Sequence, residues 1–181
     1  MCLRKTIFFG LSLGLLLVAG SGHAQTPRPS EYQLKAAFLY NFAEFIDWPA
    51  EAFADGNAPF VFGILGDNPF GNELEQTVAG KKINDRPISV QVFHSAAEAA
   101  RCQILFISNS EKRHFSEIIQ SLHGNAVLTV SDTDLFIESG GMVNFVQAAS
   151  KIRFQINDAA AKAARLKISS KLLSLAVASS R

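Results

Sequence analysis

The sequence has 181 residues, 48% of them hydrophobic and 18% charged, and carries a formal net charge of +1 at pH 7. Its lysines and arginines are scattered along the chain rather than clustered, which excludes nucleic acid as the expected partner. Beyond the N-terminus no apolar run is long enough to cross a membrane, so we expect no membrane-inserted segment in the processed chain.

Residues 1–24 predict a secretory signal peptide. Two basic residues precede an apolar run over residues 7–18, which is short for a membrane span. Small residues follow at the positions that precede a signal-peptidase cleavage site. An uncleaved anchor is the alternative. Cleavage after Ala24 would release residues 25–181 into the periplasm, a length that suits a single domain with its own core.

Residues 32–49 predict the helix around which the chain is organised. Set around a helix axis, its large apolar side chains fall within an arc of about 160°: Tyr32, Leu34, Phe38, Leu39, Phe42, Phe45 and Ile46. Lys35 interrupts this arc, and we expect its long stem to carry the ammonium group to water. Two further rings, Tyr40 and Trp48, lie outside the arc. They indicate a partner surface, unless Trp48 folds over the helix end at Pro49.

The remaining elements alternate between strands and helices. Residues 60–65 and 104–107 are apolar without alternation, as in strands covered on both faces. Residues 88–92 and 152–156 alternate and predict strands at the two sheet edges, the second of them in a hairpin with residues 142–146. Another strand is predicted at residues 126–130, and helices at 69–79, 95–100, 111–122, after Asn157 and at 171–177.

This pattern predicts an α/β fold, a flavodoxin-like three-layer sandwich. Its mostly parallel sheet has the order 2-1-3-4, extended by a C-terminal antiparallel hairpin, and the N-terminal helix is an addition docked on one face. Cys102 opens the second apolar run, so we expect a buried and inert thiol. With no second cysteine after processing, no internal disulfide is expected.

Ligands of such sheets bind beyond the carboxyl ends of the strands. The candidates there are Gly66, Asp67, Asn68, Gly71, Ser108 and Ser131. Backbone N–H groups in segment 66–71 could hold an anion, although helix capping alone explains Asp67 and Asn68.

Signatures of catalysis are sparse. The chain has no G-x-G-x-x-G, P-loop or G-x-S-x-G pattern, and its histidines lack metal-ligand spacing. A receiver domain would need an acceptor aspartate after the third strand, where this chain has Ser108 and Asn109. We therefore expect a binding module rather than an enzyme, without cofactor or metal.

Several stretches together resemble the YfiR family of periplasmic proteins. They run in family order and cover nearly all of the chain after the signal: LKAAFLYNFAEFIDWP, FGILGDNPFG, CQILFIS, VLTVSD, GGMVNF and LKISSKLLSLA. The resemblance implies a repressor that binds the periplasmic domain of an inner-membrane diguanylate cyclase or sensor and holds it inactive. Its release would raise cyclic di-GMP and favour biofilm. The resemblance also implies a homodimer. The disulfides that stabilise the family's best-known member are not expected in this chain, because Cys102 has no second cysteine to pair with.

Two functional hypotheses follow. The first is a regulator that binds another protein through Tyr40, Phe45 and Trp48, extended by Met142 and Phe145 on the hairpin; the same patch could instead serve the homodimer. The second is a periplasmic sensor of a small molecule bound at the strand ends near residues 66–71.

Overall fold

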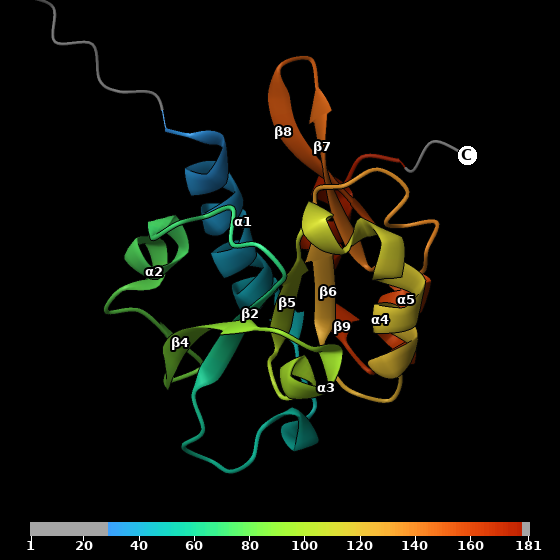
Figure 1. The fold of residues 1–181 in the computed structure, drawn as a ribbon. Coiled ribbons are helices and arrows are strands. Elements are labelled where there is room, and N and C mark those ends of the chain that lie inside the picture. The colour runs from blue at the N-terminus through green and yellow to red at the C-terminus, as the bar shows by residue number, and fades with distance from the viewer. Residues whose placement is uncertain (1–28, 179–181) are drawn as a thin grey trace, which may run out of the picture.

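The computed structural model describes residues 29–178, so the predicted signal peptide and its cleavage site lie outside the described residues (Figure 1). Within this range the main sheet has seven strands. Their order is β3 (Lys82–Ile83), β4 (Arg86–Phe93), β2 (Phe60–Leu65), β5 (Ile104–Ile107), β6 (Leu128–Ser131), β7 (Val143–Ala148) and β8 (Lys151–Ile156).

The predicted order 2-1-3-4 is confirmed. β4, β2, β5 and β6 pair in parallel, β7 joins β6 in parallel, and β8 closes the hairpin antiparallel to β7. The two-residue β3 pairs with only the first two residues of β4, through a turn at Asn84 and Asp85, both with positive φ. Such a turn suits these residue types. The rest of β4 stays at the edge, where Gln91 is exposed, as Arg153 is on β8 at the other edge.

Helices cover both faces of the sheet, as the three-layer prediction requires (Figure 1). They are α1 (Glu31–Phe45), α2 (Glu73–Val78), α3 (Ala96–Ala99), α4 (Phe115–Ser121), α5 (Asp158–Ala163) and α6 (Ser170–Leu175), with 3₁₀ turns η1 (Ala50–Ala52) and η2 (Asn109–His114). None of the helices in residues 29–178 is long and apolar enough to span a membrane.

Two apolar clusters fill the space between these layers. The larger lies between the sheet and α1, α2 and α6, and includes Phe42, Phe62 and Phe106. The smaller lies on the face covered by α3 and α4, and includes Leu105 and Phe115. The continuous apolar runs predicted as central strands are therefore buried on both faces, because successive side chains of a strand point to opposite sides.

The N-terminal helix begins as predicted and ends earlier. Ser30 and Gln33 form a capping box. The helix stops at Phe45 rather than near Pro49, and Ile46 pairs with Ile168 in a separate two-stranded sheet of β1 (Ile46–Asp47) and β9 (Lys167–Ile168). The pairing partner lies more than a hundred residues away, so a local pattern cannot reveal it.

Cys102 is buried, with 2% of its surface exposed, and burial raises the pKa of its thiol from the ordinary 9.0 to about 12. Since only the thiolate reacts, a chain that begins at Gln25 should label slowly with a thiol reagent even at pH 9, and fast in denaturant. A cysteine introduced on exposed α4 by Ser116→Cys supplies the accessible control. Rapid labelling of native Cys102 would contradict this placement.

Candidate functional site

Two aromatic rings predicted to meet a partner lie on either flank of α1. Tyr40 and Phe45 are both half-buried, and each is covered by a lysine: Lys81 Nζ lies 4.3 Å from the Tyr40 ring centre, and Lys171 Nζ lies 4.9 Å from that of Phe45. Burial, with help from Glu44, raises the pKa of the Tyr40 hydroxyl. Lysine over a ring is a weak and mobile contact when exposed. Both rings are therefore accessible to a partner that displaces the lysines.

Trp48 has its own contacts within the chain. It is half-buried, its ring packs edge-on against Phe60 with centres 5.1 Å apart, and its indole N–H donates to the Gln103 carbonyl at 3.1 Å. The ring thus folds over the exit of α1, as the simpler of the two interpretations predicted, although the chain has left the helix three residues before it.

Met142 and Phe145 lie inside this chain. Phe145 is 3% exposed and packs against Phe42 and Phe38 of α1, with ring centres 5.8 and 5.9 Å away. Met142 is also buried. The Phe145 ring therefore lies under α1, whereas Met142 lies beside Leu122 and Ala160, near α4 and α5. Alternation in a short strand does not tell which face is covered.

The residues predicted to hold a ligand lie together at the carboxyl ends of the strands. The crevice after β2 is filled there by the side chain of Ser110. A Cβ atom built on Gly66 would lie 2.3 Å from Ser110 Oγ, and the Asp67 N–H donates to that same oxygen at 3.0 Å. The Ser110 side chain thus joins η2 to the loop after β2.

The other strand-end candidates make local contacts. The Asn68 side chain accepts from the Phe70 N–H and donates to the Gly71 carbonyl, which closes a turn and delays α2 until Glu73. Ser131 is buried and donates to the Ile107 carbonyl at 2.7 Å, and Ser108 is buried as well. These contacts account for the side chains without a ligand.

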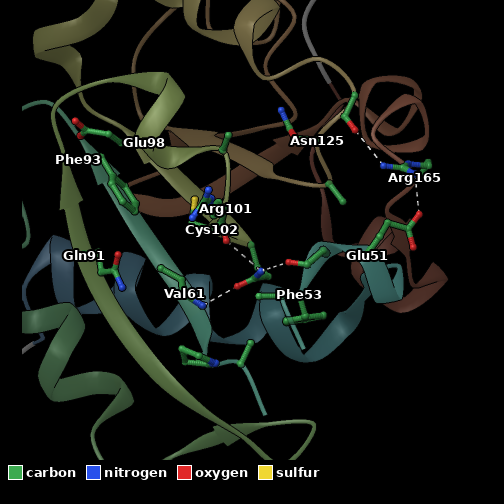
Figure 2. Close-up of a pocket in the computed structure, with 18 residues that line it drawn as sticks. Glu51, Phe53, Val61, Gln91, Phe93, Glu98, Arg101, Cys102, Asn125 and Arg165 are labelled. Carbon is green, nitrogen blue, oxygen red and sulfur yellow. Dashed lines mark hydrogen bonds and ion pairs between the residues drawn. The ribbon is translucent and has the colours of Figure 1, made fainter. Parts of the chain in front are cut away.

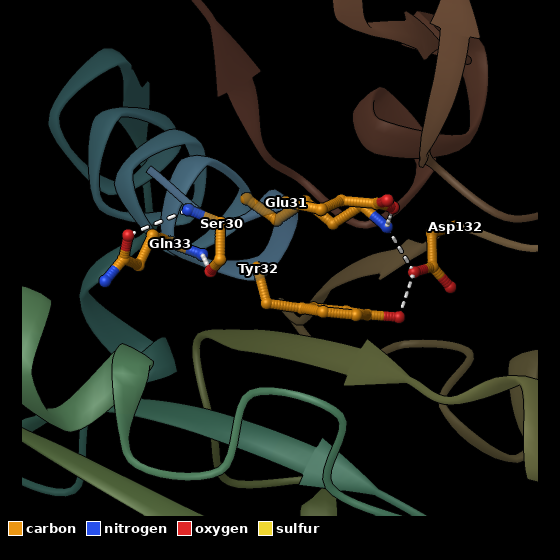
Figure 3. Close-up of polar contacts among 6 residues, drawn as sticks. Ser30, Glu31, Tyr32, Gln33 and Asp132 are labelled. Atoms are coloured by element: carbon orange, nitrogen blue, oxygen red, sulfur yellow. Dashed lines mark hydrogen bonds and ion pairs between the residues drawn. The ribbon is translucent and has the colours of Figure 1, made fainter. Parts of the chain in front are cut away.

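An ionic cluster at the same edge was missed (Figure 3). The expectation that Lys35 reaches water is wrong: it is 4% exposed, and its ammonium group binds Asp132, at the end of β6, at 2.6 Å and also Glu31. The Tyr32 hydroxyl donates to the same Asp132 oxygen at 2.9 Å. Burial and this carboxylate raise the pKa of Tyr32. The sequence did contain a feature that could have predicted this cluster: a lysine inside an apolar arc, four residues after a glutamate with which it can pair on a helix.

Shallow cavities flank this cluster. One of about 300 Å³ is lined by Lys112, Asp132 and Thr133, and one of about 200 Å³ lies between α1 and the hairpin. In residues 29–178 no group of three histidine, cysteine or acidic side chains is placed to hold a metal ion. His114 and His123 are exposed.

Comparison with known proteins identifies one family. A family model described as YfiR/HmsC-like matches residues 32–177, from the second residue of α1 to beyond the end of α6. No curated protein matches the chain.

Proposed function

Because the chain belongs to the YfiR/HmsC-like family, we propose that it is a periplasmic regulator that represses an inner-membrane diguanylate cyclase by binding the periplasmic domain of that enzyme. The match over residues 32–177 is the observation that carries the proposal. The family is regulatory rather than catalytic. In this proposal the chain controls cyclic di-GMP by occupying its partner, and a homodimer is the form that binds.

The outer face of α1 is the surface we assign to the partner. It consists of Leu34, Ala37, Tyr40, Asn41 and Phe45, and we call it the α1 surface. Leu34 is 39% exposed, and α6, which packs beside α1, adds Leu175 at 55%. Apolar and aromatic groups that remain partly wet on one face are typical of the centre of a protein interface. Trp48, Met142 and Phe145 are left out, because their contacts within the chain account for them.

Site-specific photo-crosslinking in cells tests the surface. A photoreactive residue at Asn41, exposed on α1, should crosslink to an inner-membrane protein with a cyclase domain. The matched control is the same residue at Gln120, exposed on α4 on the opposite face of the sheet, which should give no such product. A membrane product from Gln120 alone would place the interface elsewhere. A product from Asn41 to the chain itself alone would assign the surface to the dimer.

The rings themselves should carry the binding energy. Tyr40→Ala and Phe45→Ala, made singly, should keep the thermal midpoint within a few degrees yet weaken the partner contact by about 2 kcal/mol, as truncation of central interface rings does. Cellular cyclic di-GMP should rise in both strains. Unchanged cyclic di-GMP with normal protein levels would contradict the proposal.

A further inference from the structure

A cavity lined by none of the predicted ligand residues lies beside β2 and β4 (Figure 2). It has a volume of about 540 Å³ and covers the faces of β2 and β4 that point toward α3. A parallel sheet of this kind is normally covered by a helix at such a position. Here α3 is a single turn, Ala96–Ala99, so part of this face stays uncovered and Gln91 is exposed. The volume is in the range of small-molecule sites.

The floor and one wall of the cavity are held in place by buried polar contacts. Gln103 is 2% exposed, accepts from the Val61 N–H at 2.8 Å and donates to the Ala52 carbonyl at 2.6 Å. Arg86 donates to the carbonyls of Asp55 and Ala58, at 3.0 and 2.7 Å, and so fixes the loop that forms the wall. A cavity with fixed walls costs a ligand little ordering free energy.

Aromatic rings reach the cavity from two directions. Phe93 comes from the end of β4 and Phe53 from the loop after η1 (Figure 2). The guanidinium carbon of Arg86 lies 3.9 Å from the centre of the Phe53 ring. Val61 and several alanines complete the apolar lining. Such a lining favours a flat apolar ligand body that can pack against rings.

Among the charged side chains that line the cavity, Arg101 is the cation without an ion-pair partner in residues 29–178. Arg165 binds Glu51 at 2.7 Å and the Gly124 carbonyl at 3.0 Å, so these two side chains neutralise each other. Glu98 accepts from the His94 N–H at the start of α3. Within the described part of the chain, Arg101 forms no ion pair, although it lines the cavity. A free guanidinium beside an apolar cavity suits a carboxylate, which it can bind through two parallel hydrogen bonds.

We propose that this cavity binds a small aromatic carboxylate, with the carboxylate on Arg101 and the ring between Phe53 and Phe93. This site is separate from the α1 surface and goes beyond the proposed repression of a cyclase. The result of a ligand-binding test therefore does not depend on whether the proposed repression of a cyclase is correct.

Paired ligands test the chemistry directly. Benzoate, phenylacetate and 1-naphthaleneacetate would each be titrated into the purified protein against the matching neutral amide, with binding followed by NMR. At least one acid should bind, shift the backbone signals of Val61 and Phe93, and bind about tenfold more tightly than its amide. If no acid binds at about 10 mM, or if acids and amides bind equally, the proposal fails.

Three variants locate the site. Arg101→Gln should weaken the acid by about tenfold or more and leave the amide unchanged, because only the charge-assisted contact is lost. Arg113→Gln, on exposed η2 outside the cavity, is the matched control and should change neither. Gln91→Trp should fill the cavity from an exposed wall position and remove binding of both. Acid binding that survives Arg101→Gln and Gln91→Trp in folded protein would overturn the assignment.

Discussion

Replacing Phe106 with alanine should lower the free energy of unfolding by about 3–5 kcal/mol, the range found for buried aromatic side chains. Phe106 is fully buried in β5, the central strand, between Ile64 on β2 and Val130 on β6. Its ring meets that of Phe70 edge-on, with centres 4.8 Å apart. Truncation would remove this pair and leave a cavity under α1 and α2, where neighbours on three elements cannot all collapse inward.

Urea denaturation followed by circular dichroism measures this effect. Leu175→Ala on α6, where the side chain is largely exposed, supplies the control and should cost under about 1 kcal/mol. A loss under about 1 kcal/mol for Phe106→Ala, with an unchanged slope against urea, would mean that β5 is not central to the core.

The order of the sheet could be predicted because it depends on local composition. Short apolar runs without alternation are typical of strands covered on both faces. Both such runs, Phe60–Leu65 and Ile104–Ile107, lie in the interior of the sheet. The two-residue strands could not be predicted. β1 and β9 exist because Ile46 pairs with Ile168, and β3 exists because of the turn that joins it to β4. None of these three strands has a periodic pattern of its own.

The candidate site was harder to predict. A helical wheel shows the direction in which each side chain points from the helix axis, but not which residues of other elements lie in that direction. Lys35 and Trp48 have partners that are distant in sequence, Asp132 for the ammonium group and the Gln103 carbonyl for the indole. Phe45, which falls inside the apolar arc of the wheel, and Tyr40, which falls outside it, are both half-buried. The cavity beside Arg101 depends on the shortness of α3, which determines what the sheet leaves uncovered.

Replacing Asp132 with alanine should also cost about 3–5 kcal/mol, because it leaves a buried lysine without its main counter-charge. The Lys35 ammonium group would keep only Glu31, whose side chain is nearly half exposed, and the Tyr32 hydroxyl would lose its acceptor. Thermal and urea unfolding should both register the loss. The contacts join the first turn of α1 to the end of β6, so hydrogen exchange should also accelerate in the first turns of α1.

The chain contains a matched control for this prediction. Lys162 and Asp158 on α5 pair at the same 2.6 Å, but their side chains are 71% and 33% exposed. Asp158→Ala should therefore cost under about 1 kcal/mol, since water screens such pairs. The double variant Lys35→Met/Asp132→Leu should recover most of the loss, because it removes the stranded charge and fills the space with apolar groups. Equal effects of Asp132→Ala and Asp158→Ala would show that burial does not set the strength of the Lys35 cluster, and that another contact holds α1 to the sheet.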